Sequence, residues 1–372
     1  MRSFNVTGLC IPSEDYMVDI SGKIVEIIKL IDERRYFTIN RARQYGKTTT
    51  LYCLEQALKQ DYIVISISFE GLGDESFASA ETFCPVFIEL IKKALRFSSA
   101  PAEFVNIWAD ESVISFIALS ALITKLCESD KKIVLMIDEV DKVSNNCIFL
   151  HFLSMLREKF LARKAKKDYT FQSVILAGVY DIKNLKLKMI NDGLYTPSPV
   201  EGKIYNSPWN IAIDFEIDMS FSADEIATML TEYENDLSTG MDIKTISNEI
   251  YEYTRGYPYL VSRICQHIDE KLGKKWNPDG VREAVNLILS EKSVLFDDVF
   301  KNIGNNKNLS DMLYNILING EKIIFSPDNN IIGLASMYGF IRKDGLYASI
   351  ANRIFEIRIC NYFVSIAALN YC

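Results

Sequence analysis

Short apolar runs alternate with helix-forming runs between Tyr36 and Asp181, and this alternation restricts the possible folds more than any other feature. Residues 132–138 are the clearest strand, because a nearly continuous apolar run is typical of a strand buried on both faces of a parallel sheet. Strands that alternate with helices predict βαβ units, and so an α/β fold with a parallel sheet flanked by helices. The predicted strands are residues 36–40, 62–68, 132–138, 172–177 and 209–215.

After residue 215 the pattern becomes helical. Ser222 and Glu225 form a capping box, in which both side chains satisfy free backbone N–H groups at the start of a helix. Further helices are predicted at 242–254, 259–272, 281–289 and 309–318. The runs 322–325 and 339–347 form a hairpin-like stretch, and helices followed by a short β-ribbon suggest a winged-helix-like module. The predicted domains are an α/β domain at 1–218, an α-helical lid at 219–276 and a winged-helix-like domain at 277–372.

The strongest chemical signal is the sequence Tyr-Gly-Lys-Thr-Thr at 45–49, between a predicted strand and a predicted helix. A phosphate-binding loop needs inward-pointing backbone N–H groups, a lysine for the β- and γ-phosphates and a hydroxyl group for Mg²⁺. Gly46, Lys47 and Thr48 supply the second half of the Walker A pattern G-x-x-x-x-G-K-[ST], but Arg41 replaces its first glycine. The triplet also recurs by chance in unrelated proteins, so it needs support from a second motif.

That support comes from the strand 132–138, which ends in Asp138 and Glu139 about 90 residues after Lys47. In this Walker B arrangement Asp138 would hold Mg²⁺, through water or with the Thr48 hydroxyl, and Glu139 would act as the general base that orients the attacking water. The alternative is a solvated strand end or a helix cap. Because the two motifs occur in the correct order, we expect a P-loop NTPase sheet that binds a nucleotide.

Composition excludes several other classes of protein. The chain has 41 Lys+Arg against 49 Asp+Glu, a net charge of −8, so no general attraction to nucleic acid or an anionic membrane is expected. It has 2 histidines, which argues against a His-ligated metal enzyme or a Ser–His–Asp hydrolase, and 8 cysteines without a CxxC motif, which we expect to be reduced. The one basic run, at 157–167, is expected to be a solvated face.

No segment predicts a membrane anchor. The longest apolar stretch, 113–127, is too short to cross a bilayer, and the N-terminal residues lack the apolar core of a signal peptide. We therefore expect a cytoplasmic protein without membrane partners.

These motifs resemble the AAA-like ATPases of bacteria and archaea, a group related to the STAND and archaeal ATPases. The resemblance extends over about residues 4–363, and the Arg-x-Arg-Gln-aromatic-Gly-Lys-Thr form of the loop looks like the family's own variant of Walker A. The matching segments are residues 16–19, 40–48, 67–71, 137–139, 207–210, 219–222 and 256–258.

The resemblance implies that ATP and Mg²⁺ bind to this chain. Pro258 would lie near the adenine, and the segment around Tyr16 would close the other side of the base. Thr48 and Asp138 would hold Mg²⁺. The implied nucleotide-binding residues are Arg41, Arg43, Gln44, Tyr45, Gly46, Lys47, Thr48, Thr49, Tyr16 and Pro258.

Four residues are sensor candidates. Asp181 or Asn184, after the strand 172–177, would sense the γ-phosphate, although a helix N-cap at Asp181 explains that residue equally well. Arg255 and Arg263 would act as arginine fingers in trans or as lid sensors in cis. A break between two lid helices, made by Gly256 and Pro258, is the simpler interpretation of the segment at 255–258.

Three functions fit this sequence. The first is an ATPase that acts as a nucleotide-dependent switch, with ATP bound between the sheet and the lid. The second is a module that binds nucleotide without hydrolysing it and uses its winged helix to contact DNA or a protein. The third is a DNA-processing or defence ATPase with a separately encoded protein effector. Charge gives no support to a DNA partner, and the oligomeric state stays open.

Overall fold

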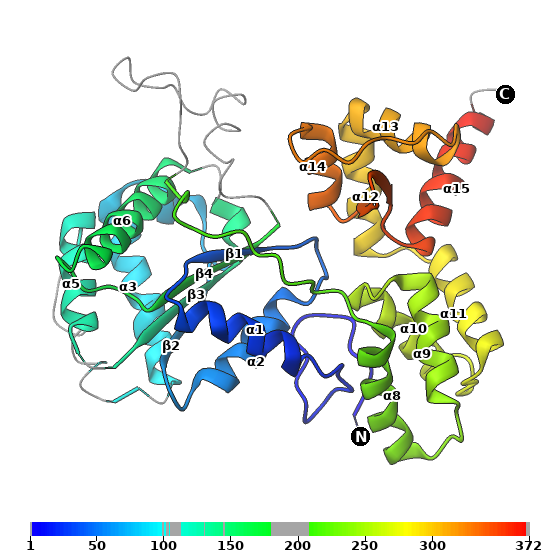
Figure 1. Cartoon of the computed structure of the whole chain (residues 1–372), viewed down its shortest axis with the longest axis horizontal. Coiled ribbons are helices and arrows are strands. Elements are labelled where there is room, and N and C mark those ends of the chain that lie inside the picture. Colours follow the sequence, from blue (N-terminus) through cyan, green and yellow to red (C-terminus); the bar gives the residue numbers. More distant parts are fainter. Residues whose placement is uncertain are drawn as a thin grey trace. The chain divides into compact units, whose positions relative to one another are not determined.

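Four parallel strands form a sheet in the order β1–β4–β3–β2 (Figure 1). Every residue of β3 and β4 is buried, which is why their apolar runs could be recognised in the sequence. The α/β fold with a parallel sheet is therefore confirmed. The strands are β1 (Phe37–Asn40), β2 (Ile63–Ser68), β3 (Ile133–Asp138) and β4 (Ser173–Gly178).

The structure is a computed structural model that describes residues 2–98, 100–101, 104, 113–129, 131–143, 146–179 and 208–369. The chain divides into two compact units. Unit 1 consists of Met1–Gly22, Arg41–Thr49 and Asp218–Cys372, and unit 2 consists of Lys23–Asn40 and Thr50–Ile217. No helix in the described ranges has both the length and the apolar character that a membrane span requires.

The fifth predicted strand, at 209–215, is reduced to a single parallel bridge between Ile213 and Phe37. The Ala212 N–H donates to the Trp209 carbonyl at 3.1 Å, so the first half of this segment forms a turn. The Trp209 side chain is fully buried, and its indole N–H donates to the Thr38 hydroxyl at 2.9 Å. Burial of this one large side chain anchors the segment without a strand.

Helices pack on the sheet through an aromatic core in unit 2. Phe83 of α3 lies 5.2 Å from Phe152 of α6 and 6.4 Å from Phe69, which follows β2 (ring centroids). Large buried rings of this kind contribute much of the apolar area that stabilises a core. The helices that lie wholly or mostly in this unit are α1 (Ser21–Asp32), α2 (Lys47–Leu58), α3 (Ala80–Arg96), α5 (Phe116–Cys127) and α6 (Cys147–Lys164), with the 3₁₀ turns η1 (Asp74–Phe77) and η2 (Val140–Val143).

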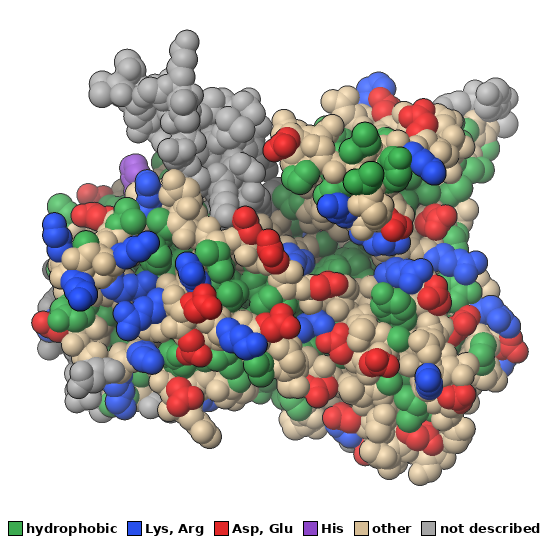
Figure 2. All heavy atoms as spheres, viewed as in Figure 1, with side chains coloured by type: hydrophobic (Ala, Val, Ile, Leu, Met, Phe, Trp, Pro, Cys, Tyr) green, Lys and Arg blue, Asp and Glu red, His purple; other side chains and the backbone are tan. Residues whose placement is uncertain are grey.

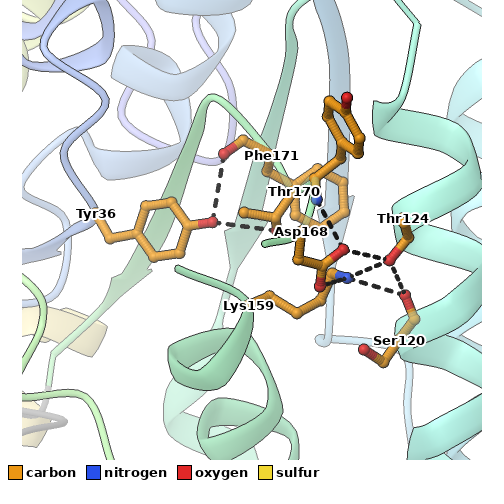
Figure 3. Close-up of polar contacts among 8 residues, drawn as sticks. Tyr36, Ser120, Thr124, Lys159, Asp168, Thr170 and Phe171 are labelled. Atoms are coloured by element: carbon orange, nitrogen blue, oxygen red, sulfur yellow. Dashed lines mark hydrogen bonds and ion pairs between the residues drawn. The ribbon is translucent and has the colours of Figure 1, made fainter. Parts of the chain in front are cut away.

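The basic run at 157–167 is not one solvated face, because the Lys159 side chain is only 1% exposed. Its ammonium group donates to the Asp168 carboxylate at 2.7 Å, to the Thr124 hydroxyl at 2.7 Å and to the Ser120 carbonyl at 3.0 Å (Figure 3). Burial opposes ionisation of Asp168, but hydrogen bonds from Lys159 and Thr124 hold its pKa below the ordinary value. The network joins α5, α6 and the segment before β4.

Three helices of unit 1 lie in the predicted α-helical lid, residues 219–276. The first begins with the predicted capping box: the Glu225 N–H donates to Ser222 Oγ at 3.1 Å, and the Ser222 N–H donates to the Glu225 carboxylate at 2.7 Å. The prediction of this helix start is confirmed. The lid helices are α8 (Ala223–Leu237), α9 (Ile243–Thr254) and α10 (Pro258–Glu270), and α11 (Pro278–Ser290) follows in the range predicted as winged-helix-like.

The remaining elements of unit 1 form a winged-helix-like module. Its β-ribbon is β5 paired with β6 across Gly345 (φ 59°), and the predicted pairing of 322–325 with 339–347 is reduced to a bridge between Ile324 and Tyr347. The sequence patterns missed α12 and α14. Besides α11, the elements are α12 (Val294–Asn305), α13 (Lys307–Leu317), α14 (Asn330–Met337), β5 (Ile341–Asp344), β6 (Tyr347–Ile350) and α15 (Arg353–Leu369).

Candidate functional site

The loop that joins β1 to α2 carries the predicted Walker A residues. Gln44 and Gly46 have left-handed backbones, with φ of 55° and 75°. Arg41 is not among the residues with positive φ, so the position where the general pattern has its first glycine does not require a glycine here. The arginine is therefore compatible with this loop.

The side chain of Lys47, the first residue of α2, folds back onto the backbone of the loop that precedes the helix. Its side chain is buried, and its ammonium group donates to the carbonyl oxygens of Arg41 at 3.0 Å and Ala42 at 3.1 Å. A buried ammonium group needs such acceptors, since burial without them is costly. Phosphate oxygens are stronger acceptors than neutral carbonyls, so the same group is suited to exchange these bonds for a nucleotide.

Two lid residues contact this loop. The Tyr257 hydroxyl donates to the Arg43 carbonyl at 2.6 Å, and its ring meets the Tyr45 ring edge-on at 4.7 Å between centroids. Burial raises the pKa of Tyr257 well above its ordinary value, so the hydroxyl keeps the proton that it donates. Pro258, the first residue of α10, lies beside Gly46: a Cβ built on that glycine would be 4.0 Å from Pro258 Cβ.

Gly256, just before these residues, is required by close packing. Its φ is 73°, and a Cβ at this position would lie 1.8 Å from the Phe221 carbonyl oxygen. The Phe221 N–H donates to the Gly256 carbonyl at 2.9 Å, which holds the segment before α8 against the start of α10. The Gly-Tyr-Pro sequence thus combines a close backbone approach with two residues that face the loop.

The winged-helix-like module also contacts the loop. Arg43 Nε lies 2.9 Å from Asp298 Oδ2 of α12. A Cβ built on Gly339, between α14 and β5, would lie 3.0 Å from Ala42 Cβ. Because both contacts are made to residues that precede Lys47, the loop conformation and the position of this module are coupled.

The N-terminal segment contacts the loop through Cys10, whose N–H donates to the Thr49 hydroxyl at 3.2 Å. Tyr16 lies elsewhere in unit 1. It is buried beside Tyr233, at 5.1 Å between ring centroids, and its hydroxyl donates to Asp236 at 3.0 Å. Burial and that carboxylate raise the pKa of Tyr16 to about 12.

In unit 2 the predicted Walker B aspartate, Asp138, is the last residue of β3 and is buried. Ile137 pairs with Leu176 of β4, and Asn40 of β1 pairs with Gly178. The carboxyl ends of β1 and β3 therefore reach the same edge of the sheet, with β4 between them. The loop with Lys47 begins at this edge, because it follows β1 directly in the chain.

Glu139 adopts an uncommon backbone conformation just after this strand. Its φ is 55°, in the left-handed region that residues other than glycine rarely enter. Its N–H donates to Asp138 Oδ1 at 2.9 Å, so the carboxylate of one predicted catalytic residue orients the backbone of the next. Strained backbone of this kind is often found at functional sites.

A family model of an AAA-like domain matches residues 29–277. The chain belongs to the AAA-like family. A Walker-type ATPase of Pyrococcus abyssi has a similar fold, with a TM-score of 0.58 and 12% sequence identity over 96% of this chain and 99% of that chain. The ORC2 protein of Aeropyrum pernix matches with a TM-score of 0.45 and 11% identity over 94% of both chains. No curated protein matches the sequence.

The structure describes two of the four predicted sensor residues of this AAA-like chain. Asp181 and Asn184 lie outside the described residues. Arg255 ends α9 with a φ of 46° and pairs with Glu252 at 3.2 Å. Arg263 makes two hydrogen bonds to Glu291, at 2.9 and 2.6 Å, and this carboxylate raises its pKa. In this conformation both arginines are thus paired with acidic side chains of unit 1.

Sequence reasoning missed Tyr257 and Asp298, which contact the loop in unit 1, and Asp141, which follows β3 in unit 2. Tyr257 was visible only as the middle residue of the Gly-Tyr-Pro segment, and Asp141 as the last carboxylate of Asp-Glu-Val-Asp at 138–141. No neighbouring motif marks Asp298 in the sequence, because its partner, Arg43, is far from it along the chain.

Proposed function

We propose that this AAA-like chain binds ATP with Mg²⁺ and hydrolyses it slowly, as a nucleotide-dependent switch. The observation that carries the proposal is the buried Lys47 ammonium group, held 3.0 and 3.1 Å from two carbonyl oxygens of a loop whose Gln44 and Gly46 have left-handed backbones. A phosphate-binding loop needs this combination of a fixed cation and a tight turn at the start of a helix.

The available donor groups suit Mg²⁺, which prefers oxygen ligands. Thr48 offers a hydroxyl group and Asp138 a carboxylate, and we assign them as the two protein ligands. When bound with ATP, the ion would supply charge neutralisation for the phosphate oxygens.

Each step of hydrolysis then has a residue assigned to it. Lys47 would bind the β- and γ-phosphates, and the N–H groups at the start of α2 would point at the same oxygens. Glu139 would orient the attacking water and accept its proton. Pro258 and Tyr45 would bound the nucleotide on the lid side, because Pro258 lies beside Gly46 and the Tyr45 ring packs against Tyr257.

The contacts of the loop support a switch. Tyr257, Asp298 and Gly339 all contact residues 42–45, and they belong to the lid and the winged-helix-like module. Phosphate binding would change the conformation of the loop and so alter these contacts. The free energy of nucleotide binding would in this way favour one arrangement of the module over another.

The winged-helix-like module carries little of the basic surface that a DNA partner would require. Helix α14 carries no charged side chain, and Arg342 of the β-ribbon pairs with Asp344 at 3.2 Å. On the face drawn in Figure 2, basic side chains are interspersed with acidic ones. Recognition of phosphates requires a local excess of basic groups, and the module offers little of it.

The test combines ATP binding with ATP turnover. Lys47→Ala is expected to abolish ATP binding, Glu139→Gln to keep binding and lose turnover, and Lys164→Ala, at an exposed position, to change neither. Tight ATP binding by the parent without phosphate release, with or without duplex DNA, would instead support a non-hydrolysing module.

A further inference from the structure

The carboxylate of Asp141 links the loop that follows β3 to the end of β4. The Val179 N–H donates to Asp141 Oδ2 at 2.6 Å. Asp141 lies in η2, two residues after Glu139. Val179 follows the last residue of β4, so this hydrogen bond joins the chain after the Walker B strand to the end of the neighbouring strand.

Gly178 provides the space for this carboxylate. A Cβ at this position would lie 2.6 Å from Asp141 Oδ1 and 3.0 Å from Val140 Cγ2. Gly178 does not have a positive φ, so backbone conformation does not explain the glycine. The absence of a side chain is instead explained by the close approach of the Asp141 carboxylate.

Glu139 is therefore held from both sides. Before it, the Asp138 carboxylate accepts its N–H at 2.9 Å. After it, Asp141 fixes the loop to β4. The left-handed φ of Glu139 is unfavourable for a glutamate, so neighbouring contacts have to maintain it. Loss of the contact at Asp141 would therefore remove one of the restraints on the Glu139 backbone.

We propose that Asp141 is a positioning residue for Glu139, and that Gly178 is required so that Asp141 can reach the end of β4. The inference rests on the proposed function, in which Glu139 orients the attacking water. Asp141 acts through the backbone and does not contact the nucleotide. Its removal therefore lowers the rate of the chemical step and leaves ATP affinity unchanged.

The experiment measures kcat, KM, the Kd of ATP and Tm for Asp141→Ala and Asp141→Asn. A small displacement of a catalytic group can lower the rate by about 100-fold, so we expect Asp141→Ala to lower kcat by about 10-fold to 100-fold. KM and Kd should change less than about two-fold. Asp141→Asn should restore kcat to within about three-fold of the parent, because its amide oxygen accepts the same Val179 N–H.

A glycine pair provides a second test that does not remove the carboxylate. Gly178→Ala should lower kcat in the same way, since the new Cβ would displace Asp141. Gly304→Ala is the matched control, because no atom lies within 4 Å of a Cβ at that helical position and its φ is not positive. If Gly178→Ala does not fold, as judged by Tm, the Asp141 variants decide the question.

The outcomes separate the two proposals. A parent protein that binds no ATP, or whose Glu139→Gln variant turns over normally, overturns the proposed function and this inference with it. If Glu139→Gln abolishes turnover while Asp141→Ala retains the parent kcat, only the positioning role is overturned. A lower Tm of Asp141→Ala with an unchanged kcat at a temperature where it is folded would assign Asp141 a purely structural role.

Discussion

The Tyr257 hydroxyl donates a hydrogen bond to the Arg43 carbonyl at 2.6 Å, and this bond joins the start of a lid helix to the middle of the loop between β1 and α2. The ring of Tyr257 also packs 5.4 Å from Phe355 of α15, between centroids. One buried side chain therefore contacts both the loop and the winged-helix-like module, which makes it a direct physical link between the two.

Tyr257→Phe should weaken this link without changing the packing of the ring. A hydrogen bond of this kind, which is partly buried, contributes about 1 kcal/mol to stability, so we expect a decrease of that size in the free energy of unfolding. The change should be measured by denaturant unfolding. Tyr347→Phe, at an exposed position, is the control and should have no effect. Equal stability of the Tyr257 variant and the parent would mean that the bond contributes nothing.

Asp298→Asn should release Arg43 for interaction with phosphate oxygens. The Arg43 side chain is 66% exposed, so its ion pair with Asp298 adds little to stability. The pair nevertheless engages the positive charge of Arg43, which lies in the loop between β1 and α2. We expect ATP to bind several-fold more tightly to the variant at low salt, with a smaller gain at high salt because ions screen the pair. Asp311→Asn, which removes the exposed Lys307–Asp311 pair at 2.6 Å, is the matched control. Unchanged or weaker ATP binding by Asp298→Asn would contradict this role.

Lys159→Met should strongly destabilise the fold. The variant would leave the Asp168 carboxylate and the Thr124 hydroxyl without their shared cation, and breaking a buried ion pair costs about 3 to 5 kcal/mol. Asp168 is partly exposed, so we expect about 3 kcal/mol in denaturant unfolding. Lys164→Met, at an exposed position of the same helix, should be neutral. Similar unfolding midpoints of the two variants would show that the network contributes little.

We expect His267 to lower the free energy of unfolding in mild acid. Burial, with nearby Arg263, lowers the pKa of this histidine below 6.5, whereas its imidazole in the unfolded chain keeps the ordinary value. The unfolded state therefore binds more protons as the pH falls through 6.5, and the free energy of unfolding decreases. Denaturant unfolding at pH 7.5 and 5.5 should show this loss in the parent and a smaller loss in His267→Gln. His151→Gln, at an exposed position, should behave like the parent.

Local patterns predicted the elements whose signals lie within a few residues. The apolar run at 132–138 identified a strand buried on both faces, and Ser222 with Glu225 identified a helix start, because burial and capping depend on neighbouring residues. The segment 209–215 looked like a strand for the same reason. A turn at Trp209 and the burial of its indole ring decided its conformation instead, and neither is visible in residue types alone.

Long-range contacts explain what the sequence could not predict at the candidate site. Arg43 pairs with Asp298 only because the fold brings separate elements together. For the same reason the Lys159 side chain is buried against Thr124 and Asp168 rather than exposed with the rest of the basic run. Helix α14 has only 8 residues, Asn330–Met337, so its apolar pattern is too short to be distinguished from a loop. Spacing predicts Lys47 and Asp138 as site residues, but it gives no signal for the residues that contact their loops.

The central claim is tested most directly by ATP binding and phosphate release measured together for Glu139→Gln and Lys47→Ala. The account predicts that Glu139→Gln binds ATP as tightly as the parent and releases phosphate at least about 100-fold more slowly, the usual scale of a lost general base. Lys47→Ala should bind no ATP. Phosphate release by Glu139→Gln at the parent rate, or ATP binding by Lys47→Ala at the parent affinity, would contradict it.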